Sequence, residues 1–220
     1  MPLAVHCWAA YAQNYPTMRD EDYRATDLIR SIKGEPPIGW GRVPVIGGYE
    51  ALNKTTSKDA PKWFGEWGAA CLAQLMPAGS LVLVPIPNSR VVVGGDDSGF
   101  KTLGLANEIA SAIGSRATVS PMLRFQVAMR SAHDGGRRDA PTLYGNLRCN
   151  PAGASFGAKH VLVDDVFTLG GHIQACAAHL QRAGKTVGIA LCAGRTTYPP
   201  VPTDPFKLAP SMLTDYVPPG

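Results

Sequence analysis

The sequence predicts an α/β protein built on an open, twisted, mainly parallel sheet with helices on both faces. Two stretches, 81–123 and 161–192, each read as a strand, a loop, an amphipathic helix and a returning strand. This order is typical of a parallel sheet covered by helices. With 220 residues, 45% of them hydrophobic and 17% charged, the chain is long enough and apolar enough to bury one full core.

The first unit begins with a continuous apolar run at 81–86, as expected of a strand buried on both faces. A loop over 87–102 leads into a helix, in which apolar residues recur at helical spacing from Leu103 to Ile113. Gly114 ends this pattern, and residues 117–123 are expected to return as a strand.

The second unit is clearer. Residues 161–163 form the expected strand, Gly170 and Gly171 open a helix, and Gly184 caps it before a strand at 187–192. Other elements are a helix that stops before Pro77 and a short helix over 25–33, whereas 36–48 reads as loop. We therefore divide the chain into an irregular N-terminal flank or hood (1–60), a core (61–198) and a proline-rich C-terminal strap (199–220).

Composition excludes several classes of protein. The net charge of +4 is too mild on its own to indicate binding to nucleic acid or to an anionic membrane. The five cysteines are widely separated and never form C-x-x-C, so the sequence encodes no local zinc site or disulfide framework. No apolar run approaches the roughly 20 residues of a membrane span, and no Lys or Arg precedes Arg19. The cytoplasm is the predicted location.

The most informative run is 161–172, where an apolar strand delivers two acids and then a small turn at a helix start. Its key residues are Asp164, Asp165, Thr168, Gly170 and Gly171. Glycines let backbone N–H groups converge on an anion, and a helix N-terminus favours phosphate. Carboxylates at the end of a strand accept hydrogen bonds from sugar hydroxyls. The run therefore predicts a sugar-phosphate site, and the alternative is an ordinary polar turn.

This run resembles the 5-phosphoribosyl-1-diphosphate (PRPP) signature of type I phosphoribosyltransferases. The resemblance implies that Asp164 and Asp165 hold the ribose hydroxyls and bind Mg²⁺ with the ligand. It also implies that the 5-phosphate is bound by the residues that follow, namely Val166, Phe167, Thr168, Leu169, Gly170, Gly171 and His172. Leu169 and His172 stand where the family usually has threonines, so each loses a hydroxyl donor and backbone donors must do more.

The run 84–90, followed by Gly99 and Phe100, is similar to the first strand and pyrophosphate loop of the ComF-like branch of this family. The resemblance implies that Asn88, Ser89 and Arg90 bind the leaving diphosphate; the alternative is a plain turn. Lys101 replaces the asparagine usual in this branch. The acids of the insert 94–98 either help to hold magnesium or are solvated, and we favour the second interpretation.

Residues 124–148 contain five arginines and two aspartates with little periodicity. This stretch resembles the loop that closes over PRPP in ComF-like proteins, and Arg130 and Asn146 fit its spacing loosely. Arg137 and Arg138 are then the expected diphosphate clamps. The competing interpretation is a surface loop that is basic for solubility. The four-cysteine zinc module of many ComF relatives is absent from the sequence, so a role in DNA uptake is not carried over.

Three functions are therefore weighed. The first is an enzyme that binds PRPP and Mg²⁺ and transfers phosphoribose to an unidentified nitrogen acceptor, with Asp164, Asp165, Arg137 and Arg138 as its catalytic residues. The second is a regulator without catalysis that senses PRPP or a nucleotide such as guanosine tetraphosphate at the same site. The third, ranked last because no basic and aromatic stripe is visible, is a ComF-like module associated with nucleic acid. A homodimer is compatible with the family, and no membrane association is expected.

Overall fold

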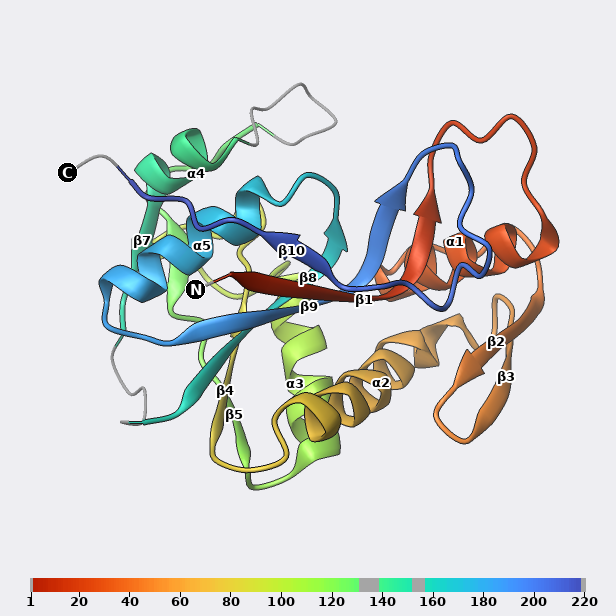
Figure 1. The fold of residues 1–220 in the computed structure, drawn as a ribbon, viewed down its shortest axis with the longest axis horizontal. Coiled ribbons are helices and arrows are strands. Elements are labelled where there is room, and N and C mark those ends of the chain that lie inside the picture. Colours follow the sequence, from red (N-terminus) through yellow and green to blue (C-terminus); the bar gives the residue numbers. More distant parts are fainter. Residues whose placement is uncertain (1, 131–138, 152–156, 219–220) are drawn as a thin grey trace.

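The computed structural model describes residues 2–130, 139–151 and 157–218. Its centre is a six-stranded sheet in the order β10-β1-β9-β8-β4-β5, in which β10 alone runs antiparallel to its neighbour (Figure 1). The strands are β1 (Leu3–Ala12), β4 (Leu81–Pro85), β5 (Ala117–Val119), β8 (Lys159–Phe167), β9 (Val187–Thr197) and β10 (Ser211–Leu213). The prediction of a mainly parallel sheet is confirmed.

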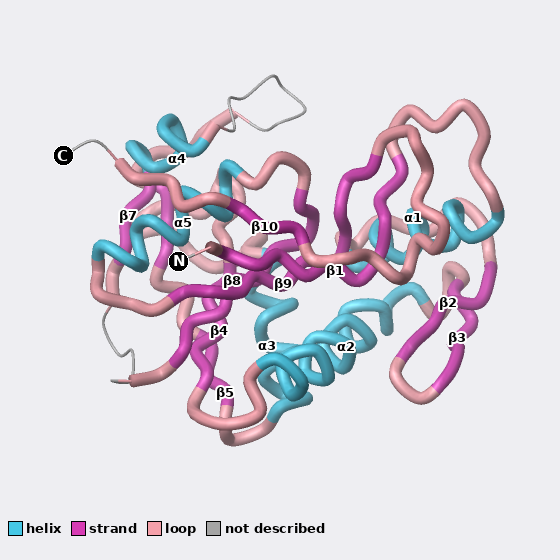
Figure 2. The backbone as a smooth tube through the Cα atoms, viewed as in Figure 1, coloured by secondary structure: helices cyan, strands magenta, loops and turns pink. Residues whose placement is uncertain are grey.

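Helices cover both faces of this sheet, as Figures 1 and 2 show. One face carries α1 (Asp20–Ile32), α2 (Ala60–Leu75) and α3 (Lys101–Ile113); the other carries α5 (Gly171–Arg182) and α4 (Ala140–Asn146). In β8, Val161 and Val163 pack into the first core and Leu162 into the second. Successive side chains of a strand point to opposite faces, so only a continuous apolar run can serve both cores.

The two predicted units are present, with one correction. Gly114 and Gly184 follow α3 and α5 in the left-handed region, at φ of 81° and 72°. The strand expected over 117–123, however, is two strands. β5 ends at Val119, and β6 (Leu123–Phe125) pairs with β7 (Leu147–Cys149) in a separate two-stranded sheet. Pro121 lies between them and has no N–H to donate to a ladder, which explains the break.

The N-terminal region is more regular than the sequence indicated. Residues 3–12 form β1, which lies between β9 and β10 inside the main sheet. Residues expected as loop include β2 (Gly41–Val45), which forms a hairpin with β3 (Gly48–Leu52); a 3₁₀ turn (Ser57–Asp59) then leads into α2. The sheet therefore takes strands from both sides of the predicted 61–198 core. β1 has four alanines and only one β-branched residue, Val5, so its strand signal is weak.

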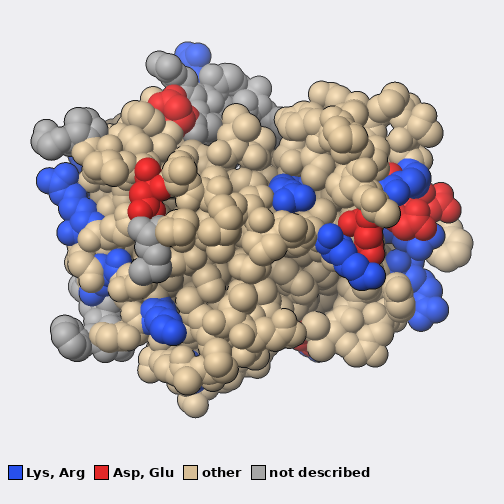
Figure 3. All heavy atoms as spheres, in the orientation of Figure 1, with Lys and Arg blue, Asp and Glu red and all other residues tan. Residues whose placement is uncertain are grey.

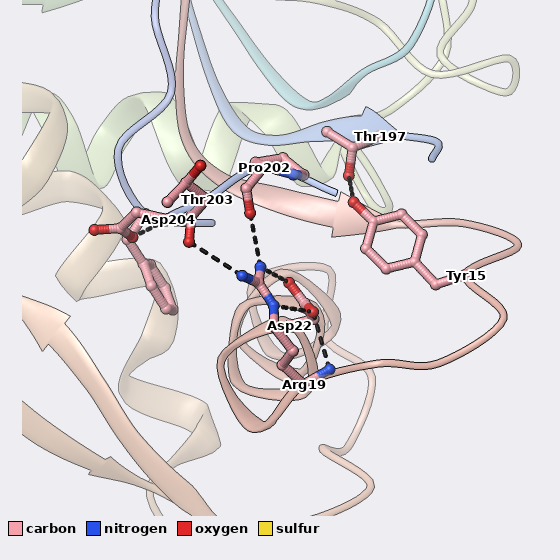
Figure 4. A network of polar contacts seen from close by, with 8 residues as sticks. Tyr15, Arg19, Asp22, Thr197, Pro202, Thr203 and Asp204 are labelled. Carbon is pink, nitrogen blue, oxygen red and sulfur yellow. Dashed lines mark hydrogen bonds and ion pairs between the residues drawn. The ribbon is translucent and has the colours of Figure 1, made fainter. Parts of the chain in front are cut away.

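The C-terminal strap is tied to the N-terminal part of the chain. Its residues 211–213 form β10 against β1, and Ala10 N donates a hydrogen bond of 2.7 Å to Pro205 O. The Arg19 guanidinium donates to the carbonyls of Pro202 (2.7 Å) and Thr203 (3.1 Å) while it pairs with Asp22, as Figure 4 shows. These contacts fix the strap beside α1. In the part of the chain that the structure describes, no helix has the length and apolar run needed to span a bilayer.

Candidate functional site

The two predicted ligand-binding segments meet at one edge of the sheet, where the parallel strands β4 and β8 both end. We call this the carboxyl edge. β8 delivers Asp164 and Asp165 to it, and β4 is the adjacent strand. Ile86 N donates to Val163 O at 2.9 Å, so the loop that carries Asn88–Arg90 begins directly beside the two acids. The structure therefore brings together the segments that the sequence placed far apart.

The two acids have different surroundings, although both act on the Cys192 thiol. Asp164, only 9% exposed, faces α5; burial raises the pKa of the Cys176 and Cys192 thiols, and the Asp164 charge raises it further. Asp165 is half-buried, and its charge also acts on Lys33. Each carboxylate is also fixed locally, because Asp165 N donates to Asp164 (2.9 Å) and Val166 N donates to Asp165 (2.7 Å). Asp165 is thus the more accessible of the two.

A short turn, residues 168–170, joins β8 to α5. Gly170 has a φ of 82°, and a Cβ atom there would lie 2.7 Å from Leu213 Cδ2, so glycine is required on two counts. Helix α5 begins at Gly171, and the first N–H groups of a helix have no partner inside it. Thr168 Oγ1 lies 2.8 Å from Thr196 Oγ1 on β9. The turn can therefore present backbone donors and one hydroxyl to an anion.

The remaining side chains of this segment point elsewhere. Val166 and Phe167 pack into the two cores, so their contribution to a ligand would come from the backbone. Leu169 is 87% exposed, and the His172 ring stacks on Phe125 with centroids 5.7 Å apart. Neither of the two residues that depart from the family pattern supplies the hydroxyl that a threonine would.

The loop after β4 is held by its own side chains. Asn88 Nδ2 donates to Gly99 O at 2.6 Å, and its Oδ1 accepts from Arg90 N at 3.0 Å. Ser89 is buried and its carbonyl accepts from Met129 N at 2.9 Å, whereas Arg90 is exposed. Of Asn88, Ser89 and Arg90, Arg90 is therefore the residue that solvent reaches most readily.

The acids of the 94–98 insert have protein partners. Asp97 forms an ion pair with Arg124 of β6. Asp96 accepts hydrogen bonds from the Ser98 hydroxyl (2.6 Å) and amide (2.9 Å), and these bonds lower the pKa of Asp96. Both acids are exposed. The insert is thus a polar surface loop fastened to β6.

The basic loop starts and ends on the β6–β7 ladder. Asn146 closes its base, because its amide accepts from Val127 N (3.1 Å) and donates to Val127 O (2.8 Å). Arg130 is exposed near the start of the loop. Arg137 and Arg138 lie outside the described residues, so their role as clamps stays a prediction.

The structure adds residues that the sequence analysis did not assign to the site. Lys33, the C-cap of α1, has its Nζ 5.3 Å from the centre of the Tyr11 ring and 3.2 Å from Glu35 Oε1. Burial lowers the pKa of Lys33, but Tyr11, the hydrogen bond to Glu35 and the charges of Glu35 and Asp165 outweigh it and raise that pKa. The ammonium group is therefore held charged near Asp165. The sequence did not indicate a role for Lys33, because nothing in it linked the helix expected at 25–33 to the acids at the end of a strand.

Two hollows lie away from the carboxyl edge, beside α1 and the β2–β3 hairpin. Their volumes are about 540 and 680 Å³, and Arg24 and Arg42 line both. Trp8 and Trp67 line the larger hollow, which the strap also borders. Figure 3 shows acidic and basic atoms intermingled at this end of the molecule, while most of the face in view is uncharged.

The donor chemistry of the site suits magnesium only in part. Among the described residues, no group of three or more His, Cys, Asp and Glu side chains could hold a metal ion. Mg²⁺ in phosphate-binding sites is commonly held by one or two carboxylates together with the ligand's phosphate oxygens and water. Asp165, with the more buried Asp164 beside it, could supply such carboxylates.

Comparisons with known proteins add little. No family model and no curated protein matches this chain. A solved structure of adenine phosphoribosyltransferase from Thermoanaerobacter pseudethanolicus is similar to it, with 16% sequence identity and a TM-score of 0.39. The similarity covers 76% of this chain and 87% of that one. An overlap this loose carries no weight for fold or function, which rest on the sheet and site described above.

Proposed function

We propose that this protein binds PRPP with Mg²⁺ at the carboxyl edge and transfers phosphoribose to a nitrogen acceptor, releasing diphosphate. One observation supports this above others. β8 delivers two carboxylates immediately before a glycine turn that opens α5, and the Asn88–Arg90 loop of the adjacent strand lies beside them. This edge would then offer carboxylates to the sugar hydroxyls, the glycine turn to the 5-phosphate and the Asn88–Arg90 loop to the diphosphate.

The chain's own residues would act mainly by positioning and by stabilising charge. Thr168 and the first N–H groups of α5 bind the 5-phosphate, and Asp165 accepts from the ribose hydroxyls, with Asp164 behind it. Ser89 and Arg90, with Arg137 and Arg138 from the basic loop, bind the departing diphosphate. Bound Mg²⁺ would neutralise part of the diphosphate charge. Membership of the ComF-like branch, a cytoplasmic location and a homodimer belong to the same proposal.

Calorimetric titration with PRPP and Mg²⁺ tests the binding. The Asp165→Asn variant removes one charge from the site, and Asp20→Asn is its control, because the Asp20 side chain is 86% exposed on α1. We expect the first variant to weaken binding at least tenfold and the second to leave it unchanged. Release of diphosphate with pooled nucleobases then tests turnover. If the wild-type protein does not bind PRPP, the proposal is wrong.

A regulator without catalysis is the second candidate, and the 5-phosphate turn favours it. The exposed Leu169 side chain and the His172 ring on Phe125 stand where the family pattern has hydroxyl donors. A ligand held there would rely more on backbone N–H groups. Binding of PRPP or guanosine tetraphosphate without release of diphosphate would support a sensor over a transferase.

A further inference from the structure

Two lysines join the ends of α1 and α3 at the carboxyl edge. Lys101, the first residue of α3, donates from its Nζ to the backbone carbonyl of Lys33 at 2.8 Å. The Lys101 amide also donates to Gly99 O at 3.0 Å, and the same carbonyl accepts from Asn88 Nδ2 at 2.6 Å. The lysines are therefore connected through Gly99 to the loop that is expected to bind diphosphate.

The position of Lys33 follows from close packing of α1 on the sheet. Gly194 on β9 has no side chain, and a Cβ atom there would lie 3.0 Å from Ile29 Cγ1. The missing side chain lets α1 lie directly on β9, which brings its last turn beside the end of β1. There the Lys33 ammonium packs over the Tyr11 ring. Only 20% of the Lys33 side chain is exposed, so its geometry is set by packing.

Cations outnumber acids around these lysines. Glu35 is shared, since one oxygen lies 3.2 Å from Arg30 Nη1 and the other 3.2 Å from Lys33 Nζ. Asp165 adds a second negative charge near Lys33, and Lys101 adds a further positive one. Three cations thus face two carboxylates, and an incoming anion would meet an excess of positive charge.

We propose that Lys33 and Lys101 form an anion subsite for the diphosphate group of a phosphorylated sugar or nucleotide. The inference rests on the proposed function and deepens it, because it assigns diphosphate binding to residues outside the basic loop. The lysines are linked to the Asn88–Arg90 loop, whereas the proposed monophosphate site is the turn at Thr168–Gly171. The two anions can therefore be tested separately.

The experiment measures affinity for inorganic pyrophosphate and for ribose 5-phosphate by calorimetry. Lys33→Met and Lys101→Met should each weaken pyrophosphate binding about tenfold and leave ribose 5-phosphate binding within about twofold. Lys33→Arg keeps the charge and should restore pyrophosphate binding. Lys62→Met is the matched control, because the Lys62 side chain is 69% exposed on α2 and pairs loosely with Glu66, at 3.9 Å.

The outcomes separate the two proposals. If the wild-type protein binds neither anion, the proposed function fails and the subsite fails with it. If it binds both and the lysine variants keep full affinity for pyrophosphate, or lose ribose 5-phosphate instead, only the diphosphate subsite is wrong. Should Lys33→Met not fold, Lys101→Met decides the question, since the Lys101 side chain is exposed.

Discussion

Two connections leave the carboxyl edge, and they are built in different ways. The turn after β8, residues 168–170, is fixed by one left-handed glycine and by the helix that follows at once. The loop after β4, residues 86–100, is held by side chains: Asn88 bonds to Gly99, and Thr102 Oγ1 donates to Ile86 O at 2.6 Å. The conformation of the β8 turn is therefore determined by neighbouring residues. The conformation of the β4 loop depends on hydrogen-bond partners further along the chain.

Gly170→Ala should have the largest effect on stability, because Gly170 fixes the conformation of the turn after β8. Alanine would be strained at φ 82°, and its methyl group would clash with Leu213 and Phe167. We expect a loss of about 2–4 kcal/mol in unfolding free energy. Urea unfolding measures it. Gly184→Ala is the control, because φ is 72° there and nothing lies within 4 Å of the added atom. Equal losses in the two variants would show that packing on β10 does not hold the turn.

Asn88→Ala removes the two side-chain hydrogen bonds that Asn88 makes within the β4 loop. We expect a smaller loss of about 1 kcal/mol in stability and a selective loss of pyrophosphate affinity, because the backbone near Arg90 is no longer fixed. Asn53→Ala provides the comparison: Asn53 makes a similar pair of bonds, to the amides of Thr55 and Thr56, far from the site. If both variants bind pyrophosphate as the wild type does, the β4 loop does not bind diphosphate.

Acid should weaken the β8–α5 unit more than the β4–α3 unit, because only the former carries histidines. Burial is the main cause that lowers the pKa of His160 on β8 and of His179 on α5. The unfolded chain therefore binds these protons first, and stability falls as pH drops from about 6.5 toward the folded values. Denaturation midpoints at pH 7.5 and 5.5 measure this. A His160→Gln, His179→Gln variant should show a flatter profile, and an unchanged slope would contradict the assignment.

Arg124→Met should have the smallest effect on stability. The ion pair between Arg124 and Asp97 lies near the surface, where such pairs contribute about 0.5 kcal/mol. The midpoint of thermal unfolding should barely change. Hydrogen exchange of the 94–98 amides should become faster, because the insert loses its contact with β6. Unchanged exchange would mean that the remaining contacts hold the insert without Arg124.

The same division explains what the sequence could predict. The order of strand, turn and helix in the β8–α5 unit was predicted, since neighbouring apolar runs and Gly170 mark them. The strand was expected only over 161–163, however, and β8 runs on through both acids to Phe167. β1 was not predicted, because its alanines carry no strand signal. The contact between Tyr11 on β1 and Lys33 was therefore not predicted either. Lys33 was missed because its place depends on α1 packing against Gly194, a contact between residues far apart in the chain. Two adjacent acids predicted one site, yet Asp164 is buried and only Asp165 is partly exposed.

The most direct test of the account is to follow backbone amide resonances by NMR while ribose 5-phosphate is added. If the turn after β8 binds the phosphate, the largest shifts should fall on residues 168–172, with little change at 88–90 until pyrophosphate is supplied. Shifts confined to the hollow lined by Arg24 and Arg42, or absent altogether, would contradict a sugar-phosphate site at the carboxyl edge.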